Sequence, residues 1–404
     1  MSKHQLHQSA RGLYRVAVVD AQTQEIVWEQ KDWGKNLILN NGMDQVAVRE
    51  WQDCFRYAAA GTGITPTAID SGAVTADQSS TTVTATVGTY TFSSGDIGNM
   101  IYWDDASEAR ITGYTNPQTV TVTPSQSVIG QHFIVYQTNQ TELATEVKRA
   151  STFLPNLPDT GTTVSTGTGL VSMRRTFDFT AEVGNVNYTE IATCWSGTLG
   201  AGNTTFSRIL LPSAVPVGVG QQLRFVYELQ ITVGPITPVS FSAAVSGWPV
   251  LPATNTDAQQ QLVYHGLGIV AASGSGMAEY GGSKTNEPST SGLNCAFWIS
   301  PYSGPLTAFG TSAIRTAVTG YDFASSSLLP YTPLSFIRDK TATFTVAQVN
   351  RIDLRMLGTG YQNPSSFFAG NYAGIIVLFS LEHTKKNTQT LTFTFRYTWS
   401  RVLS

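Results

Sequence analysis

The chain has 404 residues, of which 41 % are hydrophobic and 13 % are charged, and its formal net charge is −3. This length exceeds what a single hydrophobic core usually organises, so two or three domains are expected. The charged share is about half of that usual for soluble domains, and basic residues adjoin only in pairs such as Arg174 with Arg175 and Lys385 with Lys386. This composition argues against nucleic-acid binding, which needs a concentrated basic surface.

The cysteines and the first residues of the chain indicate the cellular compartment in which the protein is made. Cys54, Cys194 and Cys295 are odd in number and far apart, which predicts buried free thiols rather than a disulfide framework or a zinc site. The opening "MSKHQLHQSARG" has no apolar core, so we expect no signal peptide and synthesis in the host cytoplasm. No run of 18 apolar residues is present, and membrane insertion is not expected.

The first elements in chain order are a hairpin and a short helix. "GLYRVAVVD" and "EIVWEQ" alternate apolar and polar residues around "AQTQ", which predicts a β-hairpin over residues 12–30. The segment 40–51 places Met43, Val46, Ala47 and Glu50 at helical spacing, after asparagines that would cap a helix. In the "AAAGTGITP" that follows, Gly61 and Gly63 predict a tight reversal with positive φ at a strand end. The absence of a following Gly-Lys-Ser/Thr excludes a phosphate loop.

The middle of the chain suggests an insertion. A Gly/Ser/Thr-rich span over 70–82 indicates a boundary, and short strands separated by turns then predict a small inserted β module over residues 76–140. A second short helix is predicted over 141–150. Further strands are expected at 83–92, 99–103, 108–114, 119–123, 132–136, 170–182, 187–195, 205–211, 262–271, 294–299, 341–347 and 374–382.

Two long segments have the clearest strand pattern. "QLRFVYELQITV", residues 222–233, and "LTFTFRYTWSRV", residues 391–402, alternate large apolar with polar residues. The span 155–169 and the proline-containing 233–239 indicate further boundaries, and the Gly-rich 271–292 predicts a long loop.

The predicted fold class is therefore all-β, with two β-sandwich-like domains, a small inserted β module and one or two short helices. Residues 1–75 and 141–238 would form an interrupted N-terminal domain that anchors the protein. The insert would occupy residues 76–140, and a C-terminal β domain residues 239–404.

We predict no catalytic, cofactor-binding or metal-binding residues from the sequence. No G-x-S-x-G elbow or H-E-x-x-H motif is present. Among the histidines His4, His7, His132, His265 and His383, the interior ones are interpreted as structural. "GTLGAG", residues 197–202, lies between predicted strands, which favours a β-turn over a nucleotide loop.

Acidic and aromatic residues leave alternatives open. Asp96, Asp104, Asp105 and Glu108 would suit Ca²⁺ by ligand type, but their spacing favours a charged hairpin tip. The aromatic residues Tyr280, Trp298, Tyr302 and Tyr361 would stack on sugar rings if the C-terminal half binds a glycan; packing or subunit contact is the favoured interpretation.

The order of motifs resembles structural proteins of tailed-bacteriophage virions, of the tail, neck or fibre type. The resemblance rests on "KNLILNNGMDQV", "AAAGTGITPTA", "TTFSRILLPSAVPVGVGQQLRFVYELQITV" and the closing "TLTFTFRYTWSRV". "SGDIGNMIYWDDASEARITGYTNPQTVTVTP" is similar to small β modules that decorate phage tail proteins. The resemblance covers residues 12–240 most closely and the C-terminal part loosely.

The resemblance implies a virion component that is not an enzyme and needs no cofactor. Its expected partners are copies of itself, as a homo-oligomer, and other virion proteins. It implies neither nucleic-acid binding nor membrane insertion. A receptor- or carbohydrate-binding appendage, with a host-surface glycan as partner, is the alternative, and a polysaccharide depolymerase is a third.

Overall fold

The computed structural model describes residues 4–47, 54–150, 161–165, 170–233, 244–245, 296–301, 322–323, 325–346, 351–360 and 376–403. Strands dominate these residues, which confirms the predicted all-β class. The helical elements described are α1 (Asn40–Gln45) and the 3-10 turn η1 (Ser94–Asp96), and Cys54 also has helical backbone. The predicted loop 271–292 and the predicted strand 262–271 lie outside the described residues, as do His265, Tyr280, Cys295, Tyr302 and Tyr361.

The strands, in chain order, are β1 (His4–Asp20), β2 (Ile26–Glu29), β3 (Gly34–Ile38), β4 (Tyr57–Gly61), β5 (Ala68–Ala85), β6 (Met100–Trp103), β7 (Glu108–Asn116), β8 (Thr119–Tyr136), β9 (Glu146–Arg149), β10 (Gly161–Ser165), β11 (Leu170–Asp178), β12 (Val186–Cys194), β13 (Thr205–Val217), β14 (Gln221–Val233), β15 (Ala244–Val245), β16 (Ala296–Pro301), β17 (Asp322–Phe323), β18 (Ser325–Leu328), β19 (Ile337–Phe344), β20 (Arg351–Gly360), β21 (Ile376–Lys385) and β22 (Leu391–Arg401).

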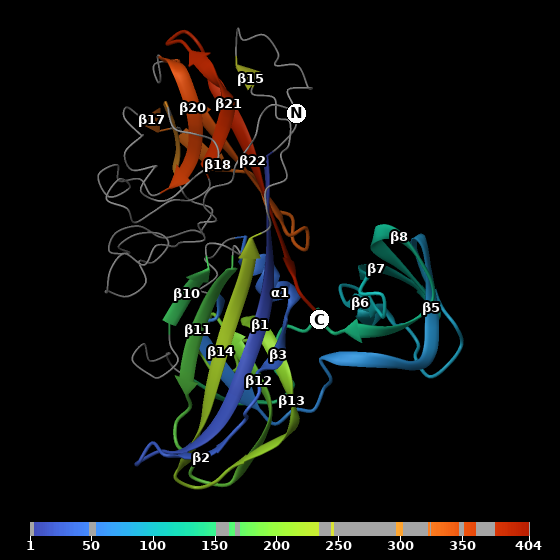
Figure 1. Cartoon of the computed structure of the whole chain (residues 1–404). Helices are drawn as coiled ribbons and strands as arrows, with labels where there is room; N and C mark the ends of the chain where they lie inside the picture. Colours follow the sequence, from blue (N-terminus) through green and yellow to red (C-terminus); the bar gives the residue numbers. More distant parts are fainter. Residues whose placement is uncertain are drawn as a thin grey trace.

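A 14-stranded sheet forms the main body, with the path β10-β11-β14-β1-β3-β13-β12-β4-β9. The antiparallel β1–β14 ladder runs from Gln8 opposite Val233 to Asp20 opposite Gln221. Every second residue of β14 faces inward, so the predicted alternation is confirmed: Phe225, Tyr227 and Leu229 are fully buried. Figure 1 shows these strands as the elongated lower body of the molecule.

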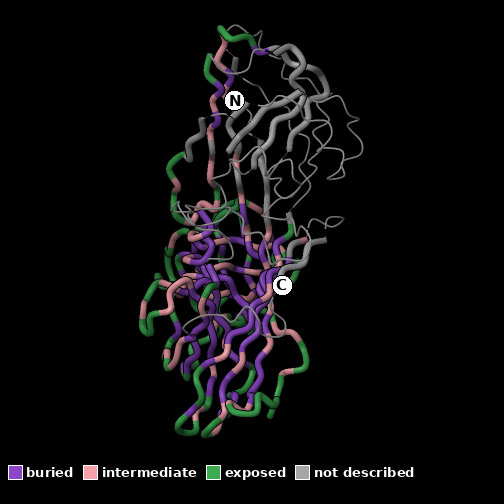
Figure 2. Tube along the Cα trace, turned by 90° about the vertical axis from the view of Figure 1, so that its left-hand side faces the viewer, coloured by how far each residue is buried: buried purple, intermediate pink, exposed green. Residues whose placement is uncertain are grey.

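The two halves of this sheet cover one core. The ring of Phe55 lies 6.2 Å from that of Phe206 on β13 and 5.3 Å from that of Tyr227 on β14. Burial of each such side chain stabilises the fold by roughly 1.5–3 kcal/mol. Figure 2 shows the buried residues running along the strands of this body.

Helix α1 closes one part of this core and is shorter than the predicted 40–51. Met43 and Ala47 are fully buried, and Met43 O accepts a hydrogen bond of 2.8 Å from the Trp399 indole. The expected asparagine cap does not form, because Leu39 occupies the N-cap position. Asn40 instead donates to Gly98 O at 2.7 Å, so this residue ties the helix to the insert.

The insert is a separate four-stranded sheet, in the order β5-β8-β6-β7, between β4 and β9 of the main sheet. It has its own core, in which Trp103 and Phe133 are fully buried, and Figure 1 places it to the side of the main body. The span 70–82, expected to be a boundary, is part of strand β5. The half-buried or exposed residues Thr75, Asp77 and Ser79 alternate with buried Val74, Ala76 and Gln78, which gives the segment an inward face.

The C-terminal part is tied into the main sheet. Strand β22 runs parallel to the first half of β1, from His4 opposite Phe395 to Ala10 opposite Arg401, and antiparallel to β19. Figure 1 shows β22 descending beside β1. A further sheet has the order β17-β16-β20-β21. The stretch 239–404 therefore shares hydrogen bonds with the predicted N-terminal domain.

The second predicted helix, over residues 141–150, is wrong. Glu146–Arg149 form strand β9, which pairs with β4 through Ala59 opposite Arg149 and Ala60 opposite Lys148. The N–H groups of Ala144 and Thr145 donate to the carboxylate of Glu190 at 3.0 and 2.7 Å, so the Thr145 N–H does not make the bond to Thr141 O that a helix would need.

Candidate functional site

A buried ion pair lies where the chain leaves the main sheet for the insert and returns. Glu190 on β12 and Arg208 on β13 are 0 and 1 % exposed, and Arg208 Nη2 lies 2.7 Å from Glu190 Oε2. Glu190 also accepts from the N–H of Gly63, and Arg208 donates to Thr65 O at 2.9 Å. The pair thus holds both connecting segments, 62–67 and 137–145.

The electrostatics of this pair are those of a structural contact. Burial by itself would raise the pKa of Glu190, but the N–H of Thr145 and the guanidinium of Arg208 outweigh it and lower that pKa. Glu190 therefore stays ionised and fully hydrogen-bonded. A carboxylate so occupied has no free lone pair directed at a substrate, so the pair suits positioning of the insert rather than acid–base catalysis.

Gly61 and Gly63 are explained by this pair and not by a turn. Neither has a positive φ, so the predicted positive-φ reversal is wrong. A Cβ on Gly63 would lie 2.4 Å from Glu190 Oε1, and one on Gly61 would lie 2.3 Å from Thr145 O. The glycines are needed because a buried carboxylate and a neighbouring backbone approach them closely.

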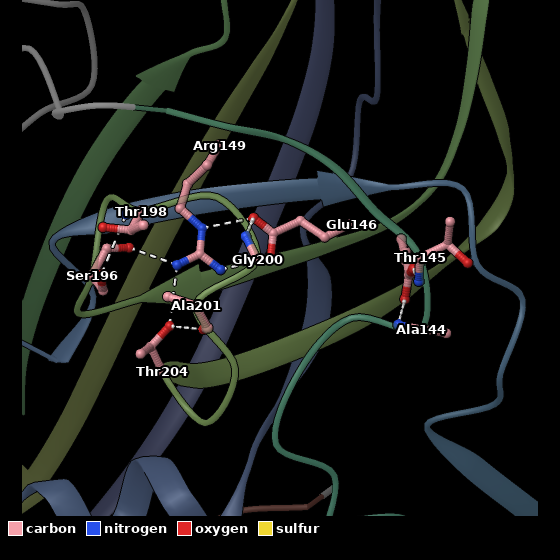
Figure 3. Close-up of polar contacts among 10 residues, drawn as sticks. Ala144, Thr145, Glu146, Arg149, Ser196, Thr198, Gly200, Ala201 and Thr204 are labelled. Atoms are coloured by element: carbon pink, nitrogen blue, oxygen red, sulfur yellow. Dashed lines mark hydrogen bonds and ion pairs between the residues drawn. The ribbon is translucent and has the colours of Figure 1, made fainter.

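A second polar cluster surrounds Arg149, as Figure 3 shows. Arg149 makes two hydrogen bonds to Glu146, of 2.8 and 2.7 Å, and donates to Ser196 O at 2.8 Å and Thr204 Oγ1 at 3.1 Å. Gly200 N donates to Glu146 at 3.3 Å. The segment 197–202 is therefore a turn between β12 and β13, as predicted. The Gly200 N–H is bonded to a side chain of the protein.

The third cluster lies on the insert. His132 on β8 contacts Asp70 on β5 through Nε2 at 2.8 Å and Asp104 through Nδ1 at 3.0 Å. The hydrogen bond to Asp70 and then that to Asp104 raise the pKa of His132. Both imidazole nitrogens are occupied, which agrees with the predicted structural role of this histidine.

The acidic residues suggested for Ca²⁺ do not converge. Asp96 caps η1 through Ser93, Asp104 contacts His132, and Asp105 accepts from the N–H of Ser107. Burial raises the pKa of Glu108, against the attraction of Arg401. Within the described residues, no group of three or more His, Cys, Asp or Glu side chains is arranged to hold a metal ion.

The two cysteines that the structure describes are both interior. Cys54 and Cys194 are both buried and unbridged, as expected. Burial raises the pKa of Cys194 to about 12, so its thiol stays protonated at neutral pH.

Exposed apolar side chains gather at one end of the main body, in a group that we name the apolar tip: Ile26, Val27, Trp28, Val183 and Val219. Ile26 and Val27 are each 55 % exposed, Trp28 is 44 % exposed and Val183 is 96 % exposed. Their turns are tied together, because Ala21 N donates to Gly220 O and Gly220 N to Glu182 O. Strand β2, at the lower end of the body in Figure 1, pairs only with β1 among the described strands. Sequence reasoning identified β2 as a strand but not as exposed on both faces, since this depends on where the sandwich ends.

Comparisons with protein-family models, curated proteins and solved structures gave no match. Within the residues that the structure describes, no helix is long and apolar enough to cross a membrane.

Proposed function

We propose that this protein is a non-enzymatic structural component of a bacteriophage virion, of the tail, neck, collar or fibre-associated type. It would act by assembling into a homo-oligomer and by contacting other virion proteins. The phage assignment comes from the sequence motifs given above. The assembly mechanism is supported by the structure of the chain.

The observation that carries the assembly mechanism is the apolar tip. Edge strands offer unpaired backbone groups to a further strand, and β2 adds three consecutive exposed apolar side chains to that edge. Burying such side chains against another protein would remove apolar surface from water, which is favourable. The low charge of the chain also means that a large contact would desolvate few ions.

The polar clusters favour this mechanism over catalysis. Glu190, Arg149 and His132 each have their polar atoms engaged with protein groups. A catalytic acid, base or nucleophile needs a free atom within reach of a substrate.

Two measurements test the proposal. Sedimentation equilibrium of the purified chain over a range of concentrations should show a mass that rises above 43.5 kDa. Antibodies raised against the chain should label purified virions of the phage that encodes it. A chain that stays monomeric at every concentration and never labels particles would contradict the proposal. Binding to a glycan array without particle labelling would favour the carbohydrate-binding alternative.

A further inference from the structure

A cavity of about 130 Å³ lies where the main sheet, the insert and the C-terminal strand meet. We name it the junction pocket. Its walls come from β1 and β3 through Arg11, Lys35 and Leu37, from the insert through Tyr136, and from the chain after β22 through Val402 and Leu403. Three parts of the chain that are far apart in sequence thus enclose one small space.

Strand geometry directs Arg11 and Lys35 to the same side of the sheet. Gly12 lies opposite Asn36, and Leu13 lies opposite Lys35. The Cα–Cβ direction at Gly12 leads into the core, because a Cβ there would lie 2.7 Å from the hydroxyl of Tyr227. Side chains alternate along a strand, so Arg11 and Leu13 face the opposite, outer side, together with Lys35. Arg11 and Lys35 are diagonal neighbours across the two strands, within reach of one another.

The charges around the pocket are unbalanced. The lining includes Arg11, Lys35 and Arg208, and no acidic residue. Arg208 is neutralised by Glu190. Among the described residues, neither Arg11 nor Lys35 forms an ion pair, and Arg11 Nε is buried without a hydrogen-bond partner. A cation that lacks a counter-ion in a partly buried pocket carries a desolvation penalty that an anion at this position would reduce.

The geometry of the donors favours a carboxylate. The two Nη groups of a guanidinium form a planar pair of donors that matches the two oxygens of a carboxylate. Lys35 is exposed and would supply a second positive charge at the rim, and Tyr136 lines the pocket from the insert side. The apolar groups Leu37, Val402 and Leu403 would contact the carbon atoms attached to the carboxylate.

We propose that the junction pocket binds a carboxylate, held by Arg11 and Lys35. The carboxylate would belong either to a free small organic acid or to an acidic side chain of a second copy of this chain. This site is independent of the proposed virion role. Because its walls come from three parts of the chain, an occupied pocket would connect the insert and β22 to the main sheet.

The test follows the Nε–H resonances of the arginine side chains by NMR while sodium acetate is added to the full chain at constant ionic strength. The signal of Arg11 is identified by its loss in Arg11→Gln. It should shift and saturate with acetate and stay in place with sodium chloride. In Lys35→Gln, which leaves the Arg11 signal intact, the acetate affinity should fall about tenfold, as expected when one charge-assisted contact is lost.

Lys386→Gln is the matched control, because Lys386 is exposed and does not line the pocket. Its acetate affinity should equal that of the unaltered chain. An Arg11 signal that does not respond to acetate would overturn the proposal, as would an unchanged affinity in Lys35→Gln. Tighter binding of inorganic phosphate than of acetate would overturn the assignment to a carboxylate.

The source of the carboxylate is distinguished by sedimentation. If an acidic side chain of a second copy occupies the pocket, acetate should lower the mass of the associated chain. If the natural ligand is a free acid, acetate should leave that mass unchanged. Both results accord with a carboxylate site, provided that the Arg11 signal responds.

Discussion

Individual residues at the base of the insert are constrained by one buried carboxylate. Glu190 accepts hydrogen bonds from the N–H groups of Gly63, Ala144 and Thr145 and from Arg208. Because every one of these partners is itself held by the sheet or by its connecting segments, the carboxylate cannot shift without breaking several contacts. The glycine opposite it therefore has no space for a side chain.

Gly63→Ala should be destabilising for this reason. Its Cβ would lie 2.4 Å from Glu190 Oε1 and 2.5 Å from the Cβ of Ala144. Overpacking of this kind lowers the free energy of unfolding by about 1–3 kcal/mol, which urea denaturation would measure. Gly184→Ala is the control, since a Cβ at Gly184 meets nothing within 4 Å. Equal effects of the two substitutions would contradict the close-approach explanation.

A pH dependence is expected from His132. The hydrogen bonds to Asp70 and Asp104 raise the pKa of His132 above its ordinary value of about 6.5, so the folded state binds this proton more tightly than the unfolded chain does. The stabilisation is thus fully present below about pH 6.5 and is lost as the pH rises through the higher folded pKa. On the acid side, the lowered pKa of Asp70 means that its contribution is lost only as the pH falls below about 4.

The measurement compares the unaltered chain with His132→Gln. The difference between their free energies of unfolding should be largest near pH 5 to 6 and should shrink as the pH is raised above about 6.5. A difference that is constant across this range would show that the imidazole contributes without being protonated.

At the scale of elements, strand β9 illustrates how tertiary contacts override local pattern. The segment "TELATEVKRA" has helical spacing. In the structure, however, Glu190 accepts hydrogen bonds from the N–H groups of residues 144 and 145, and Arg149 donates hydrogen bonds to Ser196 and Thr204. These partners lie about 45 or more residues further along the chain. No local window of sequence contains them, so the helix prediction could not be corrected from sequence.

The strands with strict alternation were predictable for the opposite reason. In β14 each inward residue is large and apolar. This alternation, with a period of two residues, is by itself sufficient to predict a strand. The predicted strands 119–123 and 132–136 are instead one strand, β8. Strand β8 continues through Gly130 because β5 pairs along it. That pairing includes register shifts, which the sequence does not reveal.

Strand β2 provides the test of assembly at this scale. Trp28→Ser removes the largest exposed apolar side chain of the apolar tip, and interface tryptophans often dominate affinity. We expect self-association, measured by sedimentation, to weaken roughly tenfold or more. Tyr114→Ser is the matched control: Tyr114 is 37 % exposed but lies on the insert. Association that responds equally to both changes would argue against the tip as the contact.

At the scale of the whole molecule, the chain has separate cores. The cluster around Trp103 and Phe133 shares no residue with the cluster around Phe225 and Tyr227. The all-β fold class and the presence of an insert could be predicted from composition and from the turn-forming residues. The Glu190–Arg208 pair and the junction pocket did not, because their residues come from segments that meet only in the folded chain.

Trp103→Ala should therefore act locally. Truncating this fully buried side chain should destabilise the insert by about 3–5 kcal/mol. Hydrogen–deuterium exchange should show lost protection in β5 to β8 and little change in β1 and β14. Equal loss in both regions would mean that the two cores unfold as one unit.

The parallel pairing of β1 with β22 has a consequence for biosynthesis. His4 on β1 is translated long before Phe395, the β22 residue that lies opposite it. Until β22 is made, residues 4–10 of β1 lack the strand that pairs with them along this edge, which a chaperone or a neighbouring nascent chain would be able to occupy. Completion of this ladder must therefore wait for β22, so ribosome stalling before Leu391 should leave a product that is prone to mispairing.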